Sequence, residues 1–284
     1  MTIVRAAGAL VVAMVAGALA ISVWVAPGVA AGALLHRSRT PLYRDKPSSC
    51  VDETFAGDGV RLAGWRCVAS APRRGAIVYL HGIGDNKSGA AGVVERFGPL
   101  GFDVVAYDSR AHGKSQGEYC TYGVRERHDL QRVIATLAPG RVVLIGSSLG
   151  AGVAIQTAAL DSRVSAVVAA EVFADLRSVA TERGRRLWLP PWTITRAFPI
   201  AEQRIGFHID EASTLAAAWR VTAPVLLLHG SDDEDTGPIH SQRVHDALAG
   251  PRELRFVPGA RHNGTLSAPG VWDVIERWIV GVTG

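Results

Sequence analysis

The sequence has 284 residues, of which 48% are hydrophobic and 20% are charged, and its formal net charge is +4. This length suits one membrane-directed segment followed by a globular domain of about 240 residues with a large core. All but three of the 30 Lys and Arg residues are arginine, and they are spread along the whole chain. Because they form no basic stripe, we expect no nucleic-acid partner.

The first apolar segment, Ala6–Ala26, carries no charge. At about 1.5 Å per residue a helix of this length reaches about 30 Å, the thickness of a bilayer core. We interpret residues 1–36 as a transmembrane anchor or a secretory signal. The anchor is favoured because the apolar region of a cleavable signal is shorter. In the alternative, the triplet Ala31-Gly32-Ala33 serves as a cleavage site.

Residues 37–49 form a polar segment that contains a proline and is interpreted as a linker. Its basic residues bear on the orientation of the membrane segment, since only Arg5 precedes the apolar run. Four basic residues follow it: Arg37, Arg39, Arg44 and Lys46. The positive-inside tendency would therefore keep the following domain in the cytoplasm.

The cysteines indicate the opposite side. Cys50 and Cys67 flank a β-hairpin pattern whose favoured two-residue turn is Asp58-Gly59. If those two residues form the loop, Cys50 lies directly opposite Cys67, close enough for a disulfide, and a disulfide implies an oxidising compartment. Two unrelated thiols are the alternative. We expect a membrane-anchored protein with an extracytoplasmic domain, and we expect the remaining Cys120 to be chemically inert.

Short apolar strands alternate with helices along the rest of the chain. Strands are expected at 76–80, 103–107, 165–170, 225–228 and 253–257, together with a central strand that begins at Arg141; helices are expected at 85–100, 118–137, 149–160, 239–248 and 271–282. This rhythm is typical of a mainly parallel sheet with helices on both faces. We therefore predict one α/β domain over residues 50–284.

Residues 173–223 lack strand character and interrupt this alternation. An insertion at the C-terminal edge of a parallel sheet lies over the ligand crevice. We therefore predict that this segment is a cap.

The central strand ends in Gly146-Ser147-Ser148-Leu149-Gly150 and passes directly into helix-compatible residues. A strand that turns sharply into a helix holds its central residue in a strained conformation, with room only for glycine two positions away on either side. The spacing of Gly146 and Gly150 selects Ser148 as a nucleophile over its neighbour Ser147. The first backbone N–H of the helix, that of Leu149, then points to the same side and supplies half of an oxyanion-binding site.

A serine nucleophile needs a base, and the base needs an acid to orient it. In this sequence Ser148 is followed by a group of aspartates after one strand and by His262 after the next. That is the chain order of the triad in α/β-hydrolases. The region from about residue 51 to the C-terminus resembles this superfamily. Within it, the apolar N-terminus, the loop from Asp108 to Ser115 and the segment Ala170-Glu171-Val172-Phe173 resemble the membrane-anchored branch of monoacylglycerol lipases, lysophospholipases and protein depalmitoylases.

The resemblance implies roles for individual residues. His262 would be the general base, and the pattern His-Gly-x-x-Asp selects Asp233 as the acid over its neighbour Asp232. The following proline comes one residue later than is usual for the family, which keeps Asp235 as an alternative acid. The second oxyanion donor would be the backbone N–H of Ile83. His81 and His229, in His-Gly turns, would be structural.

We accordingly predict a serine hydrolase that cleaves carboxylic ester or thioester bonds of acyl, lipid-like substrates through an acyl-enzyme intermediate. One alternative is a serine peptidase of the same fold, with Glu171 or Glu182 binding a peptide N-terminus. A second is a non-catalytic binding protein that keeps the fold. No residue spacing indicates a metal site, a phosphate loop or a dinucleotide fingerprint, so no cofactor is expected.

Overall fold

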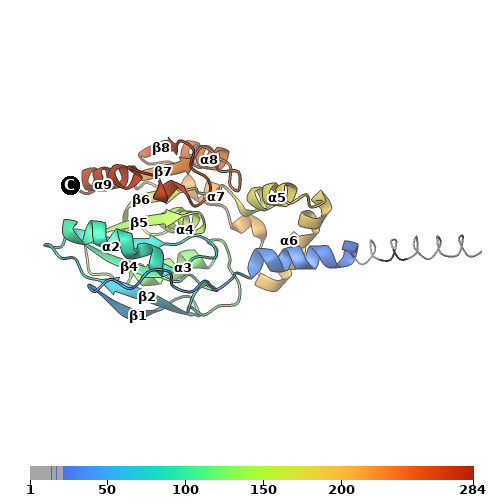
Figure 1. Ribbon diagram of the computed structural model, residues 1–284, viewed down its shortest axis with the longest axis horizontal. Coiled ribbons are helices and arrows are strands. Elements are labelled where there is room, and N and C mark those ends of the chain that lie inside the picture. Colours follow the sequence, from blue (N-terminus) through green and yellow to red (C-terminus); the bar gives the residue numbers. More distant parts are fainter. Residues whose placement is uncertain (1–13, 15–16, 18–21) are drawn as a thin grey trace, which may run out of the picture.

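The computed structural model describes residues 14, 17 and 22–284. Its centre is an eight-stranded sheet in the order β1-β2-β4-β3-β5-β6-β7-β8 (Figure 1). Seven strands of this sheet run in one direction, and only β2 runs in the opposite direction. The strands are β1 (Cys50–Ala56), β2 (Arg61–Cys67), β3 (Gly75–Leu80), β4 (Phe102–Tyr107), β5 (Arg141–Ser147), β6 (Val164–Ala170), β7 (Val225–Gly230) and β8 (Arg252–Val257).

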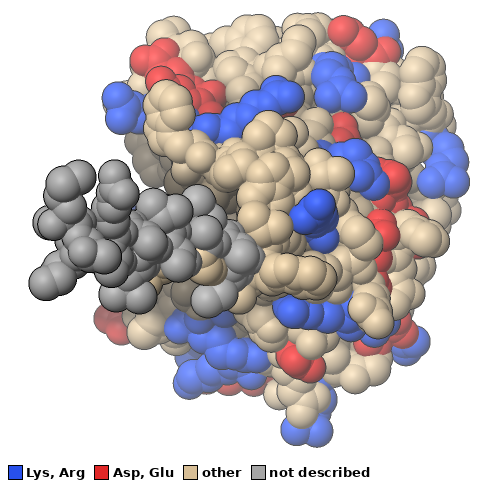
Figure 2. All heavy atoms as spheres, turned by 90° about the vertical axis from the view of Figure 1, so that its right-hand side faces the viewer, with Lys and Arg blue, Asp and Glu red and all other residues tan. Residues whose placement is uncertain are grey.

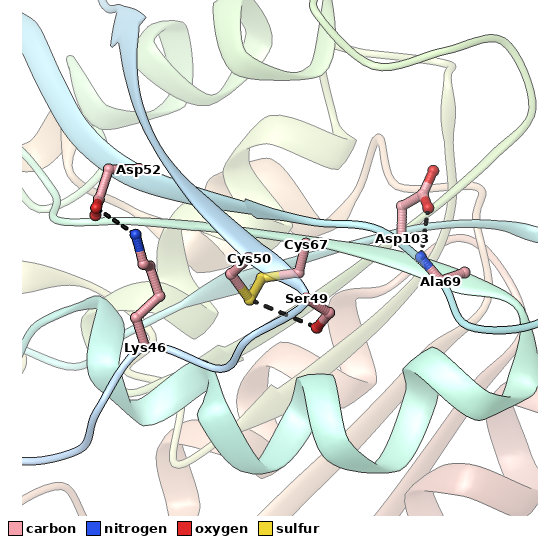
Figure 3. The surroundings of a disulfide bond; sticks show 7 residues. All are labelled: Lys46, Ser49, Cys50, Asp52, Cys67, Ala69 and Asp103. Carbon is pink, nitrogen blue, oxygen red and sulfur yellow. Dashed lines mark hydrogen bonds and ion pairs between the residues drawn. A yellow bond between two sulfur atoms is a disulfide. The ribbon is translucent and has the colours of Figure 1, made fainter.

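The first two strands form the predicted hairpin. The N–H of Gly57 donates to the carbonyl of Val60 at 2.8 Å, which closes the two-residue turn. This register pairs Cys50 with Cys67, and the two residues are joined by a disulfide bond (Figure 3). The two-residue turn therefore fixes the register of the hairpin, and the register places the two cysteines close enough to form the disulfide.

Alternate side chains of the parallel strands enter two separate cores. On β3, Ile77 and Tyr79 belong to one core and Val78 and Leu80 to the other. The first core is covered by α2 (Ala91–Phe97) and α9 (Val271–Thr283). The second is covered by α3 (Glu126–Ile134), α4 (Leu149–Ala158), α7 (Thr214–Ala218) and α8 (Ile239–Ala247). Both faces of the sheet are thus buried, as the continuous apolar strands require.

The segment between β6 and β7 lies at one end of the molecule, with α5 (Leu176–Arg186) and α6 (Pro191–Ile205) projecting beyond the sheet (Figure 1). Residues 22–35 form a helix that runs beside them and buries Ala31 and Leu35 in the same core. Charged side chains of both signs are dispersed over this end of the molecule (Figure 2).

The predicted membrane anchor falls mainly on residues outside the described part of the chain. Within residues 14, 17 and 22–284, no helix combines the length and the apolar character that a bilayer crossing requires.

The segment interpreted as a linker is fixed to the domain at several points. The guanidinium of Arg39 donates to four carbonyls of one loop, those of His112, Gly113, Ser115 and Gly117. The hydroxyl of Thr40 donates to the carbonyl of Gly84. This segment is therefore part of the domain's packed edge.

The predicted helix over residues 118–137 is wrong in its first part, because α3 begins only at Glu126. Tyr122 and Gly123 have φ angles of 52° and 106°, which no right-handed helix contains. The carboxylate of Glu126 accepts hydrogen bonds from the N–H groups of Thr121 and Gly123 at 2.7 and 2.8 Å. These bonds stabilise a turn that carries Tyr122 toward the C-terminal edge of the sheet.

Candidate active site

Ser148 lies between the end of β5 and the start of α4, with a φ angle of 50°. A Cβ atom on Gly146 would lie 2.4 Å from the carbonyl carbon of Gly150, and one on Gly150 would lie 2.1 Å from the carbonyl oxygen of Leu80. Real side chains never come so close to backbone, so both positions require glycine. The sharp turn holds Ser148 in a strained backbone conformation, which is characteristic of functional sites.

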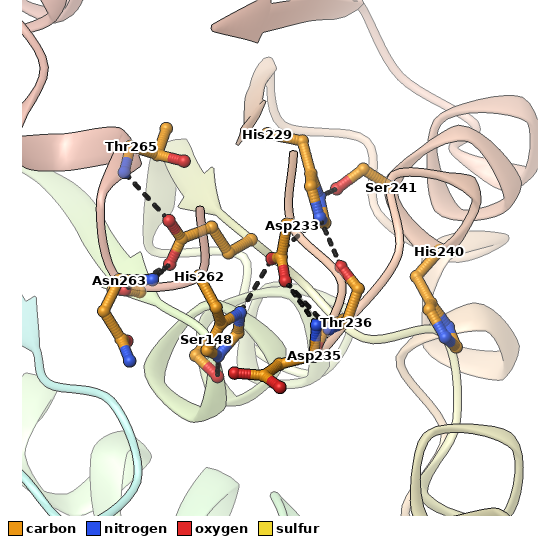
Figure 4. Close-up of polar contacts among 12 residues, drawn as sticks. Ser148, His229, Asp233, Asp235, Thr236, His240, Ser241, His262, Asn263 and Thr265 are labelled. Carbon is orange, nitrogen blue, oxygen red and sulfur yellow. Dashed lines mark hydrogen bonds and ion pairs between the residues drawn. The ribbon is translucent and has the colours of Figure 1, made fainter. Parts of the chain in front are cut away.

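The structure brings Ser148, His262 and Asp233 into one line of hydrogen bonds (Figure 4). The Oγ atom of Ser148 is 3.1 Å from Nε2 of His262, and Nδ1 of the same ring is 2.7 Å from Oδ2 of Asp233. Ser148 follows β5, Asp233 follows β7 and His262 follows β8, so the ends of three parallel strands of one sheet position these groups.

Asp235, the alternative acid, does not contact the histidine ring. Its carboxylate is 3.4 Å from the guanidinium of Arg186, and its backbone N–H donates to Oδ1 of Asp233 at 3.0 Å. The extra residue before Pro238 therefore leaves Asp233 in the position next to His262.

The environment of Asp233 favours its charged form. Burial by itself raises the pKa of this carboxyl, but hydrogen bonds from the rings of His229 and His262 and from the N–H of Thr236 outweigh burial and hold the pKa well below its usual range. The carboxylate therefore stays ionised at neutral pH. Its Oδ2 atom is 3.2 Å from Nε2 of His229, a contact that the sequence analysis missed when it gave His229 only a structural role.

In the sequence, the only indication of this contact is the His-Gly pair that ends β7 four residues before Asp233. Nδ1 of His229 lies 2.6 Å from the hydroxyl of Ser241, and Nε2 lies 2.7 Å from the carbonyl of Thr236. Because the carbonyl can only accept, Nε2 carries the proton, which it can share with the nearby carboxylate of Asp233.

The two expected oxyanion donors lie beside the nucleophile. Ile83 and Leu149 line the same pocket as Ser148, and neither N–H has a protein acceptor within the described residues. The loop that carries Ile83 is fixed by the buried His81, whose Nε2 accepts from the N–H of Ser109 at 2.9 Å while Nδ1 donates to the carbonyl of Gly82 at 2.7 Å. Two backbone N–H groups of residues that line one pocket, without protein acceptors among the described residues, are suited to binding a negatively charged oxygen.

Comparisons with known proteins agree with this architecture. A family model described as the alpha/beta hydrolase fold matches residues 75–199. The chain has the α/β-hydrolase fold. The matched residues include β3 to β6 and the serine turn at Ser148.

Two solved structures and one curated relative illustrate how far this hydrolase fold is shared. The esterase Pf2001 of Pyrococcus furiosus has a TM-score of 0.65 at 22% identity and covers 87% of this chain and 96% of its own. Acetyl xylan esterase 1 from Thermoanaerobacterium has a TM-score of 0.66 at 18% identity and covers 93% and 94%. YqkD, an uncharacterised protein of Bacillus subtilis, is 29% identical over 66% of this chain and 64% of its own length, so the match spans just under two thirds of that relative.

The pocket of this hydrolase fold at Ser148 is narrow. Its volume is about 10 Å³, which is room for about one water molecule. Besides the nucleophile and the two oxyanion donors, the lining consists of Tyr122, Phe173, Val179, Arg183 and Thr236. A larger cavity of about 1100 Å³ lies between α2 and α9 and reaches Ser147, but Ser148 does not line it.

Glu171 and Glu182, the two candidates for binding a peptide N-terminus, form hydrogen bonds with other groups of the domain. Glu171 is buried, and its carboxylate accepts from the N–H groups of Asn263 and Thr265 at 2.8 and 2.9 Å. Glu182 is 2.8 Å from Nε2 of His240. Neither carboxylate lines the pocket of Ser148.

The remaining thiol lies outside the site. Cys120 is buried, and burial raises the pKa of its thiol, which keeps it protonated and unreactive.

Proposed function

We propose that this protein is a serine hydrolase that cleaves carboxylic ester bonds. One observation carries the proposal: the Ser148, His262 and Asp233 side chains form a hydrogen-bonded line beside two backbone N–H groups that have no acceptor among the described residues. The likeness in fold to esterases supports it.

In the proposed reaction, His262 takes the proton of Ser148 as its Oγ attacks the ester carbonyl. Asp233 holds the ring with Nε2 facing the serine and stabilises the positive charge that the ring acquires. The N–H groups of Ile83 and Leu149 bind the oxyanion. His262 then gives its proton to the leaving alcohol, and water releases the acyl group by the same steps.

Labelling with a fluorophosphonate probe tests this proposal. Wild-type protein should be labelled, and Ser148→Ala should not be. Ser147→Ala is the matched control, because it removes a neighbouring hydroxyl whose contact is with Glu171 at 3.5 Å. Labelling of Ser148→Ala, or loss of labelling in Ser147→Ala alone, would show that the nucleophile is misassigned.

Two observations bear on the length and type of the acyl group, and they favour different substrates. The narrow pocket favours a short acyl group, whereas the resemblance to monoacylglycerol lipases, lysophospholipases and depalmitoylases favours longer esters or thioesters. Turnover of acyl esters of increasing length, an acyl thioester and an aminoacyl anilide separates these classes. We expect ester turnover to exceed anilide turnover, because Glu171 and Glu182 are not available to bind a peptide N-terminus.

We also propose that the N-terminal apolar segment attaches the protein to a membrane with the domain in an oxidising compartment. The uncharged sequence Ala6–Ala26 supports attachment, and the disulfide between Cys50 and Cys67 supports the compartment. Cell fractionation combined with thiol alkylation before and after reduction tests both. Recovery in the soluble fraction with all three cysteines reduced would contradict them.

A further inference from the structure

One wall of the pocket at Ser148 is formed by a charged side chain. Arg183, in α5 of the predicted cap, lines this pocket together with Tyr122 and Phe173. A guanidinium is costly to keep in a half-buried pocket unless an anion accompanies it.

The hydrogen bonds of Arg183 go to neutral groups. Its Nε donates to the backbone carbonyl of Asp235 at 3.1 Å, and its Nη2 donates to the hydroxyl of Thr236 at 3.0 Å. Within the described residues no carboxylate lies within 4.0 Å of it, and Nη1 has no hydrogen-bond partner. The nearby carboxylate of Asp235 is paired with Arg186.

A second arginine contacts Tyr122, another residue that lines this pocket. The Nη2 atom of Arg37 donates to the hydroxyl of Tyr122 and to the carbonyl of Leu34, and the guanidinium carbon lies 5.5 Å from the centroid of the Tyr122 ring. Its Nε is buried without a partner, and no carboxylate pairs with it within the described residues.

The two charges are close enough to affect each other. Burial lowers the pKa of Arg37, and the positive charge of Arg183 lowers it further; burial also lowers the pKa of Arg183, against the charges of Asp235 and Asp233, which raise it. Two guanidiniums near one pocket, neither of them in an ion pair with a carboxylate of the described residues, favour an anionic ligand beside them.

We propose that Ser148 acts on an ester that carries a second, anionic group, a carboxylate or a phosphate, and that this group binds at Arg183. Arg183 contacts this group directly through Nη1, and Arg37 adds charge from behind Tyr122. The inference rests on the proposed function and names its substrate class. Planar guanidinium donors match the oxygens of both anions.

A matched pair of substrates tests the inference. Methyl hydrogen succinate and methyl butanoate have the same methyl ester and similar length, but only the first ends in a carboxylate. We expect kcat/KM to favour the charged ester in the wild type, and Arg183→Gln to reduce this preference about 10- to 100-fold, the range of a hydrogen bond to a charged group. Arg183→Lys should retain part of it.

The control variant is Arg185→Gln, which removes an exposed arginine from the same helix. It should keep the wild-type preference. Turnover of the neutral ester by Arg183→Gln shows that this variant is folded, so the ratio of the two esters isolates the loss of the charge.

A second pair, 1-acetylglycerol 3-phosphate and 1-acetylglycerol, identifies the anion. A preference for the charged ester that Arg183→Gln reduces, in one or both pairs, supports the inference. The pair in which it occurs shows whether the site binds a carboxylate, a phosphate or both. An equal effect of Arg183→Gln on charged and neutral esters in both pairs would overturn it while leaving the proposed function in place. Failure of the proposed function is distinct, because the wild type would then hydrolyse no ester and take up no fluorophosphonate.

Discussion

The carboxylate of Glu171 accepts a hydrogen bond from the N–H of Asn263, the residue that directly follows His262. Its other oxygen accepts from the N–H of Thr265, so one buried side chain at the end of β6 holds the loop that carries the proposed base. Glu171 has a φ angle of 56°, an uncommon conformation for a residue with a side chain. These observations make Glu171 a positioning residue.

We expect Glu171→Gln to lower kcat about 10- to 100-fold with little change in KM, because the amide satisfies only one of the two N–H groups and the His262 loop shifts. The rate of fluorophosphonate labelling should fall in parallel. Glu182→Gln is the control, since its carboxylate contacts His240 and not this loop. Unchanged labelling of Glu171→Gln would contradict the positioning role.

Substitution of the two candidate acids should have unequal effects. Asp233→Asn keeps the size of the side chain but removes the charge that holds the His262 ring, and we expect kcat to fall by about 10⁴-fold, as in other serine triads. Asp235→Asn should stay within about threefold of wild type, because its carboxylate pairs with Arg186. Steady-state kinetics on a neutral ester measures both, and the reverse order of effects would assign the acid to Asp235.

A buried histidine pair should make stability depend on pH. His112 is fully buried with its ring 5.2 Å from that of His81, and burial lowers its pKa from 6.5 to about 4. Between these values the unfolded chain binds a proton that the folded chain does not, so stability rises with pH and is lost as pH falls from about 6.5 to about 4. This difference between the pKa values of the unfolded and folded chain corresponds to a loss of about 3 kcal/mol in the free energy of unfolding once the pH has fallen below both values.

Chemical denaturation at pH 7 and at pH 4.5 tests this expectation. His112→Asn should lose less stability than wild type over this range, because position 112 then carries no imidazole to be protonated. His208→Asn, which removes an exposed histidine, should keep the wild-type pH dependence. Equal slopes for wild type and His112→Asn would show that His112 does not contribute.

The disulfide should stabilise the edge of the sheet without affecting the site. It closes a loop with a sequence separation of 17 between Cys50 and Cys67, for which the entropy model gives about 3 kcal/mol. Reduction should lower the melting temperature of wild type. The double variant Cys50→Ser, Cys67→Ser should have this lower melting temperature both with and without reductant. Ester turnover at 25 °C should be unchanged in both, and Cys120→Ser should respond to reductant like wild type. A melting temperature insensitive to reduction in wild type would contradict the prediction.

Local patterns predicted much of the fold. The positions of the strands along the chain, the two-residue turn at Asp58-Gly59 and the glycines around Ser148 each depend on residues close together in the chain. For this reason the sequence alone predicts the register that pairs Cys50 with Cys67 and the sharp turn at Ser148.

The less accurate predictions concern contacts between distant segments. The start of α3 at Glu126 depends on a carboxylate that stabilises the turn at Tyr122, and helical periodicity does not report such a turn. The role of His229 was missed because its contact with Asp233 appears only when the loop after β7 folds back on the strand.

The sequence by itself determined a mainly parallel α/β sheet with a strained serine after its central strand, because strand period, turn chemistry and glycine sterics act over a few residues. Only the tertiary structure decided that Asp233 rather than Asp235 contacts His262, that Glu171 holds the His262 loop, and that Arg183 and Arg37 lie near the same pocket. These relationships join residues that are distant in the chain, and their geometry depends on how the loops at the strand ends and the segment over them pack together.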